Sequence, residues 1–235
     1  MDDRAVPVAG SLLAFLDAEQ VRALLSSGVE RAYGPNEVLV REGDPTDHVQ
    51  VLRAGWVRVS TTVEDGGEIL YALRGPGDVI GEMAALLGWP RTASVRTIEP
   101  VRVTQFSGAG FARAVRERPE VSLAVIKALA HRLREAEAAR VDIATLEVSD
   151  RVVGCLFHLA RDHGVSADGK VSVELPLTQQ DIADHIGASL RAVARAIAVL
   201  RDRGVVHTSR KRITVARPAV LAALARSMPS GTHQP

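Results

Sequence analysis

The amino-acid sequence predicts an α+β fold: an N-terminal β jelly-roll domain, one long helix, and a C-terminal domain of short helices with a pair of strands. Three observations support this prediction. Short β-branched segments separated by glycine-containing turns occupy residues 36–106. No glycine or proline interrupts residues 120–145, and two helical segments with capping residues and a glycine between them follow at 177–206.

Composition limits the class of protein. The 235 residues are 46% hydrophobic and 24% charged, which suits a soluble chain with two domains. No apolar run reaches the roughly 18 residues that cross a bilayer, and the acidic N-terminus lacks the basic start of a signal peptide. We therefore expect a cytoplasmic protein that makes no membrane contact.

The chain has little capacity for a metal or redox centre. Its single cysteine, Cys155, excludes an internal disulfide and cannot supply the thiolates of an iron–sulfur cluster. The surrounding apolar run, VVGCLFHL, indicates a buried position rather than a reactive thiol. The seven histidines form no clear haem-ligand pattern, so we expect no metal, haem or cluster.

Basic residues gather toward the C-terminus, although the formal net charge is only +1. Residues 170–217 contain nine Lys or Arg against four Asp or Glu. A locally basic domain is typical of proteins that bind nucleic acid.

The first half alternates short strands and turns. Residues 11–30 have apolar positions at helical spacing, which predicts one or two short helices. The strand segments that follow are 38–40, 49–52, 56–61, 69–73, 94–98 and 101–106. Many short strands with glycine turns favour an antiparallel barrel or jelly roll.

Residues 81–94, GEMAALLGWPRTAS, place a carboxylate and a guanidinium around a short apolar helix. Arg91 presents a planar fork of donors that can form two parallel hydrogen bonds with a phosphate. Glu82 can accept a hydrogen bond from a hydroxyl. Gly81 and Ala93 are small enough to let main-chain amides approach an anion. An ordinary helix with a surface ion pair is the alternative. The segment resembles the phosphate-binding cassette of cyclic-nucleotide-binding domains, in which the Arg pairs with the cyclic phosphate and the Glu with the ribose hydroxyl.

The long helix predicted from 119 to 145 has an apolar seam. Its positions follow alternating steps of three and four residues, broken by Arg140: Ile126, Leu129, Leu133, Ala136 and Ile143. A helix packed only on its own barrel is the alternative, but roughly 40 Å, at 1.5 Å per residue, exceeds what a small barrel covers. We expect a parallel homodimer through these residues.

A second motif, LTQQDIADHIGASLRAVARAIAVLRDRGVV, covers residues 177–206. Thr178 and Asp181 form a capping pattern, and Ser189 caps a second helix beyond a glycine. Arg191 and Arg195 project together from the exposed face of that second helix. This is the geometry of a helix-turn-helix, whose second helix enters the major groove of DNA.

Strand-like segments at 171–175 and 207–215 flank this motif and predict a wing, whose tip at 210–212 can contact phosphates. A three-helix bundle with a solvated basic face is the alternative. The expected DNA contacts are Thr178, Gln179, Gln180, Ser189, Leu190, Arg191, Arg195, Arg210, Lys211 and Arg212.

The order of these parts gives the expected domains. They are an effector domain at 1–118, a dimerisation helix and hinge at 119–147, a winged helix-turn-helix at 148–227, and a disordered tail at 228–235. Ser149 or Asp150 is expected to cap the helix after the hinge.

The chain resembles the CRP/FNR family of bacterial transcription regulators, in which a barrel with a cassette, a long helix and a winged helix follow one another in this order. The resemblance covers about residues 20–217. It implies a protein that is not an enzyme, with a small effector in the N-terminal domain, a two-fold-symmetric site on double-stranded DNA, and RNA polymerase as a partner. It also implies that Arg132 pairs with Glu82. The implied effector-binding residues are Gly81, Glu82, Met83, Arg91, Thr92, Ala93, Arg132, Ala136 and Glu137.

Two departures from the family pattern bear on the effector and the operator. Ala136 and Glu137 stand where members that depend on cAMP carry hydroxyl or amide side chains that bond adenine. Leu190 and Arg191 replace the usual Arg-Glu pair of the recognition helix, so the familiar operator is not assumed. We expect a cyclic nucleotide such as cAMP as the effector. The alternatives are another ligand, such as a cyclic dinucleotide, or DNA binding without nucleotide.

Two other classes of function, an enzyme and a nucleotide-gated module without DNA activity, fit the sequence less well. A cupin-like enzyme needs clustered His and carboxylate ligands on adjacent strands, and His48 is the only histidine in the barrel region. A nucleotide-gated module without DNA activity, as in kinase regulatory subunits, does not account for the paired arginines of the helix-turn-helix.

Overall fold

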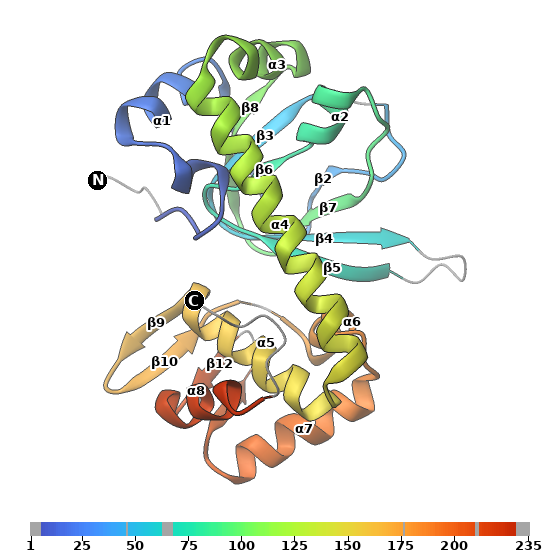
Figure 1. Cartoon of the computed structure of the whole chain (residues 1–235), viewed down its shortest axis with the longest axis vertical. Coiled ribbons are helices and arrows are strands. Elements are labelled where there is room, and N and C mark those ends of the chain that lie inside the picture. The colour runs from blue at the N-terminus through green and yellow to red at the C-terminus, as the bar shows by residue number, and fades with distance from the viewer. Residues whose placement is uncertain (1–5, 46, 63–67, 176, 210–211, 229–235) are drawn as a thin grey trace. The chain divides into compact units, whose positions relative to one another are not determined.

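The computed structural model describes residues 6–45, 47–62, 68–175, 177–209 and 212–228. The chain divides into two compact units, residues 1–133 and 134–235, and the boundary falls inside the long helix α4 (Pro119–Thr145). Figure 1 shows the order of the elements in each unit.

The first unit opens with the short helices that the sequence predicts, η1 (Leu12–Phe15) and α1 (Ala18–Leu25). Asp17 begins α1 with a capping box, because its carboxylate accepts from the amide of Gln20 while the Gln20 side chain accepts from the amide of Asp17.

Among the described residues of this unit, eight strands form two antiparallel sheets, which confirms the jelly roll. One sheet has the order β1 (Val29–Tyr33), β8 (Val101–Phe106), β3 (Val49–Ala54), β6 (Val79–Ile80). The other has the order β2 (Val38–Val40), β7 (Ser94–Thr97), β4 (Val57–Thr62), β5 (Glu68–Arg74). Strands β1 and β6 are absent from the sequence prediction; β6 has only two residues, too few to show a period.

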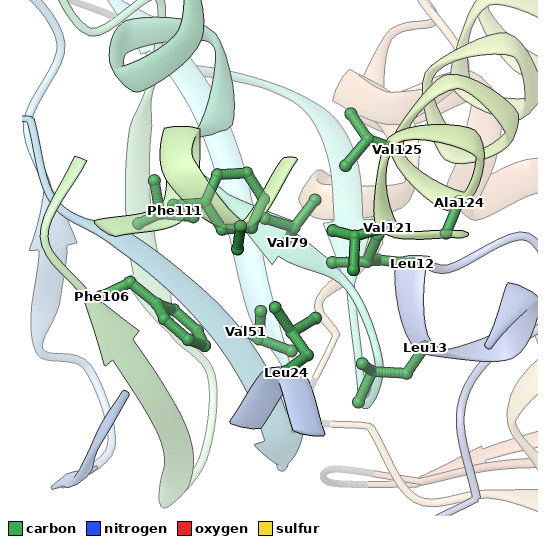
Figure 2. Close-up of a cluster of buried hydrophobic side chains, with 12 residues drawn as sticks. Leu12, Leu13, Leu24, Val51, Val79, Phe106, Phe111, Val121, Ala124 and Val125 are labelled. Carbon is green, nitrogen blue, oxygen red and sulfur yellow. The ribbon is translucent and has the colours of Figure 1, made fainter. Parts of the chain in front are cut away.

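Successive side chains of a strand point to opposite faces of the sheet, and this alternation produces two hydrophobic cores. One face buries Leu52, Val57 and Val103 inside the barrel. The other face buries Val51, Val79 and Phe106 against α1, α3 (Gly108–Glu117) and the first half of α4. Figure 2 shows this second core, with Val121 of α4 beside Leu12 of η1. The start of α4 is therefore packed on the jelly roll.

The described part of the second unit contains four further helices and a four-stranded sheet. The helices are α5 (Val148–His163), α6 (Gln179–His185), α7 (Leu190–Asp202) and α8 (Pro218–Arg226). The sheet has the order β11 (Val206–Ser209), β12 (Arg212–Val215), β10 (Lys170–Val173), β9 (Gly164–Ala167). The predicted wing strands correspond to β10, β11 and β12.

The expected start of α5 was wrong. The N-cap is Glu147, which makes no side-chain capping bond, so Ser149 and Asp150 lie in the first turn and not before it. Helix α4 stops at Thr145, and the oxygen of Glu147 already accepts from the amide of Arg151 at 3.0 Å, so α5 begins ahead of both candidates. Asp150 still places a negative charge at the positive end of the helix dipole.

Candidate effector and DNA-binding sites

The cassette helix α2 (Glu82–Leu87) begins and ends on glycines with positive φ. Gly81 precedes it at φ 82°, and Gly88 follows it at φ 69°. A β-carbon on Gly81 would collide with the Arg91 guanidinium. The glycine is therefore required both by its backbone conformation and by the close approach of Arg91.

Arg91 is buried in the cassette, with 3% of the residue exposed. Its Nη1 donates to the main-chain oxygen of Gly81 at 3.0 Å, and its Nη2 donates to that of His48 at 2.6 Å. The main chain of Arg91 is paired as well: its oxygen accepts from the amide of Gly43 at 2.8 Å, and its amide donates to the oxygen of Asp44 at 3.2 Å. Residues 43–44 therefore fix the position of Arg91.

Burial and three nearby carboxylates have opposite effects on the charge of Arg91. Burial lowers the pKa of Arg91, and the negative charges of Asp47, Glu82 and Asp44 act in the opposite direction. Burial also lowers the pKa of the neighbouring His48 imidazole, and the Arg91 guanidinium lowers it further. His48 is therefore neutral at pH 7.

Glu82 and Arg132 form the ion pair that the family resemblance implies. Arg132 Nη1 donates to Glu82 Oε1 at 2.9 Å, and only 6% of the Glu82 side chain is exposed. A second carboxylate, which the sequence did not predict, also bonds Arg132: Asp78 Oδ1 accepts from Arg132 Nη2 at 3.1 Å. Its position next to a glycine-proline-glycine turn indicated only the turn, and no spacing rule links it to Arg132.

The remaining effector candidates occupy different environments. Ala93 is buried and Met83 half-buried, while Thr92 is exposed. Ala136 and Glu137 are exposed positions of α4 in the second unit.

The predicted seam of α4 divides into two sets. Leu129 is half-buried and packs against the jelly-roll core. Ile126, Leu133 and Ile143 are 62%, 60% and 50% exposed, and Ala136 is also exposed. Leu123, which the sequence analysis did not single out, is 51% exposed on the same helix. Leu129 therefore contributes to the core of its own chain, unlike the exposed members of the predicted seam.

The helix-turn-helix has the caps that the sequence predicts. Thr178 Oγ1 accepts from the amide of Asp181 at 3.0 Å, while the amide of Thr178 donates to the Asp181 carboxylate at 2.8 Å. Ser189 caps α7 by accepting from the amide of Ala192 at 3.3 Å. Gly187 lies between the helices at φ 62°. These contacts fix the direction in which α7 leaves the turn.

The two faces of α7 differ as predicted. Val193, Ile197 and Leu200 are buried, whereas Arg191 and Arg195 are exposed one turn apart. The other candidates on this motif, Thr178, Gln180, Ser189 and Leu190, are exposed, and Gln179 is half-buried. Gln180 already donates to Asp184 Oδ1 at 2.6 Å.

The wing is only partly described. Arg210 and Lys211 lie outside the described residues, as does the predicted tail from 229 onward. Arg212 donates to Glu174 Oε1 at 2.5 Å, so its charge is compensated by a neighbouring carboxylate. Its capacity to bind a phosphate is correspondingly reduced.

The described residues contain neither a membrane-spanning helix nor a cluster of metal-binding side chains. None of the described helices is long and apolar enough to cross a membrane. The described part of the chain contains no group of three or more His, Cys, Asp or Glu that would hold a metal ion.

Two family models match the chain. The model of the cyclic nucleotide-binding domain matches residues 30–118, and that of the Crp-like helix-turn-helix domain matches residues 150–224. These ranges contain the cassette and the capped helices α6 and α7 respectively.

Whole-chain comparisons agree. The chain is 32% identical to the CRP-like cAMP-activated global transcriptional regulator of Mycobacterium tuberculosis, over 79% of this chain and 83% of that protein. It is 29% identical to the global nitrogen regulator of Nostoc, over 83% and 88% of the two chains. The fold matches a CooA mutant from Carboxydothermus hydrogenoformans with a TM-score of 0.73 at 19% identity, covering 94% of this chain and 98% of that one. By both of its domains and by its relatives, the chain belongs to the CRP/FNR family of transcription regulators, which regulate genes and are not enzymes.

Proposed function

We propose that a cyclic nucleotide, with cAMP as the first candidate, binds at residues 81–93 and controls the affinity of this regulator for DNA. The observation that carries the proposal is the buried cassette, in which Glu82 and Arg91 lie 5% and 3% exposed around α2. A guanidinium suits a cyclic phosphate and a carboxylate suits a ribose hydroxyl, so these two side chains can together bind a cyclic nucleotide. The name of the Mycobacterium tuberculosis relative supports cAMP.

One observation favours a second candidate function. In it, the regulator either answers a different ligand, such as a cyclic dinucleotide, or binds DNA without any nucleotide. Arg91 already donates to two main-chain oxygens, and the carboxylates of Asp44, Asp47 and Glu82 surround it. These bonds use two of the five guanidinium donors, and a cyclic phosphate must approach the carboxylates to reach the others. Ala136 offers no hydrogen-bonding side chain to a base, and Glu137 brings a negative charge.

On the DNA side, we infer a homodimer whose two α7 helices read a two-fold-symmetric site. The exposed apolar residues Ile126 and Leu133 on α4 support the dimer, because large apolar side chains rarely stay solvent-exposed along a helix face. Exposed Arg191 and Arg195 support readout by α7. RNA polymerase is the partner through which such a regulator acts.

Two measurements on the full-length protein test this function. Calorimetry with cAMP, cyclic GMP and cyclic di-GMP identifies the ligand, and a gel shift on genomic fragments with and without that ligand shows its effect. We expect micromolar or tighter binding of one cyclic nucleotide and a change in DNA affinity of about tenfold, a coupling of roughly 1.4 kcal/mol. Binding of DNA that no nucleotide alters would support the second candidate.

A further inference from the structure

Arg132 is held by acceptors within the cassette and immediately before it. Its Nη1 donates to Glu82 Oε1 in the cassette, whereas its Nη2 donates to Asp78 Oδ1 at 3.1 Å and to the main-chain oxygen of Val79 at 2.7 Å. Both acceptors of Nη2 lie outside the cassette, at the start of β6. Arg132 therefore has an attachment to the barrel that does not involve the cassette.

The Asp78 carboxylate is fixed in orientation by its own turn. Asp78 Oδ2 accepts from the amide of Gly75 at 3.0 Å, which directs Oδ1 toward Arg132. The turn is joined to β3, since the amide of Leu52 donates to the oxygen of Asp78 at 2.9 Å and the amide of Gly77 to the oxygen of Leu52 at 2.8 Å. Asp78 is therefore a rigid acceptor.

The N-terminal segment shields this turn from solvent. The amide of Val8 donates to the oxygen of Pro76 at 2.8 Å, and that of Leu13 to the oxygen of Gly77 at 3.1 Å. Gly10 packs against His131, the neighbour of Arg132, closely enough that a β-carbon would collide with the ring. The side chains of Asp78 and Arg132 are only 10% and 19% exposed. A charge pair shielded in this way loses more on removal of one partner than an exposed pair does.

We propose that Asp78 is a positioning residue, which holds Arg132 in place without Glu82 and so leaves Glu82 able to accept from a hydroxyl of the effector. The inference rests on the proposed function, because it explains how one glutamate serves both α4 and a ligand. Without the Asp78 charge, more of the hold on Arg132 falls to Glu82, and the ligand hydroxyl competes with the guanidinium for that carboxylate.

Asp78→Asn tests the proposal with a side chain of the same shape. An asparagine has one acceptor oxygen, so its NH2 group must face either the Gly75 amide or the Arg132 guanidinium, both of which are donors. We expect Tm to fall by roughly 3–8 °C and the Kd for cAMP to rise about five- to tenfold in the full-length protein. Asp78→Ala, which removes both bonds, provides the upper limit on the thermal effect.

Arg132→Lys provides the matched background, because an ammonium group lacks the fork that reaches both carboxylates. In the Arg132→Lys background, Asp78→Asn should lower Tm and weaken cAMP binding by less than half as much as in the parent. Equal effects in both backgrounds would mean that Asp78 acts only through its turn, and would overturn the proposal. Glu82→Gln gives a second check: it should lower Tm less than Asp78→Asn, and a larger drop contradicts an independent attachment.

The outcomes separate this inference from the proposed function. If the parent binds no cAMP, the choice of effector fails. The Tm values of the parent, Asp78→Asn, Arg132→Lys and the double variant still show whether Asp78 holds Arg132. If the parent binds cAMP and Asp78→Asn changes neither Tm nor Kd, the positioning role fails while the effector stands.

Discussion

Ile143, near the end of α4, lies against Gly187 in the turn of the helix-turn-helix. A β-carbon on Gly187 would be 3.1 Å from Ile143 Cδ1 and 3.8 Å from Arg151 Nη1. Arg151 also donates from Nη1 to the oxygen of Ile186 at 2.8 Å. The end of α4 and the start of α5 therefore both contact the turn that precedes α7. This contact also gives Ile143, predicted for the dimer seam, a partner within its own chain.

Gly187→Ala should destabilise the second unit and weaken DNA binding. A non-glycine residue at positive φ costs about 1–2 kcal/mol, and the methyl group would add a tight contact with Ile143. Gly204→Ala is the matched control, because Gly204 has φ 65° but no neighbour within 4 Å of its would-be β-carbon. Chemical denaturation and gel shifts on both variants make the comparison. Equal losses at the two positions would show that contact with Ile143 does not matter.

Arg91→Ala should weaken binding of a cyclic nucleotide by roughly 2–5 kcal/mol, because a charge-assisted pair with the phosphate is lost. Arg91→Lys should recover only part of the affinity, since an ammonium group lacks the bidentate fork. Arg96→Ala on β7 is the control, because Arg96 donates to the oxygen of Asn36 away from the cassette. Calorimetry measures all three variants. Unchanged affinity in Arg91→Ala would remove the cassette from the binding site.

Glu substitutions on the exposed side of α4 should yield monomers. Ile126→Glu with Leu133→Glu places two charges in the proposed interface without disturbing the core, because both side chains are more than half exposed. Leu129→Glu should instead destabilise the first unit, since Leu129 packs against its core. Ala139→Glu is the control, an exposed position on another side of the helix. Sedimentation distinguishes these results, and a monomeric parent at micromolar concentration would refute the dimer.

Strong local signals made much of this structure predictable. Thr178 and Asp181 form a capping box, and the predicted long helix coincides with α4 from Pro119 to Thr145, because caps and an uninterrupted helical period are properties of neighbouring residues. The start of α5 was missed because Ser149 and Asp150 are suitable caps by residue type, whereas the bond from the Arg151 amide to the Glu147 oxygen sets the boundary.

Contacts between distant residues were less predictable. Asp78 and Arg132 are 54 positions apart, and only the family resemblance pointed from Arg132 to Glu82. Leu129 satisfies the heptad pattern as well as Leu133 does, but the curvature and position of the jelly roll decide which of them is buried by its own chain. Such choices depend on tertiary packing, which periodicity alone does not specify.

Acidification should destabilise the first unit through His48. Its folded-state pKa is below the ordinary value of 6.5, so the unfolded chain binds more protons between the two values. The stabilising contribution is therefore present above pH 6.5 and is lost as pH falls below it. His48→Gln should reduce the loss of stability between pH 7 and pH 5, measured by denaturation. Burial raises the pKa of Glu99, so Glu99→Gln should change the profile in the opposite sense. A His48→Gln profile parallel to that of the parent would exclude this role.

Base readout should depend on Arg191 and phosphate contact on the wing. Arg191 and Arg195 are exposed one turn apart on α7, and an Arg fork matches the two major-groove acceptors of guanine. Arg191→Ala should cost about 1–3 kcal/mol on the preferred duplex and reduce discrimination at one base pair per half-site. Lys211→Ala should weaken specific and scrambled duplexes alike and lower the slope of log K against log salt by about one. Arg212→Ala should have a smaller effect than Lys211→Ala, because Arg212 pairs with Glu174. Salt titrations of each variant on both duplexes provide the test. Equal weakening of the two duplexes by Arg191→Ala would assign Arg191 to a phosphate and move base readout to Arg195.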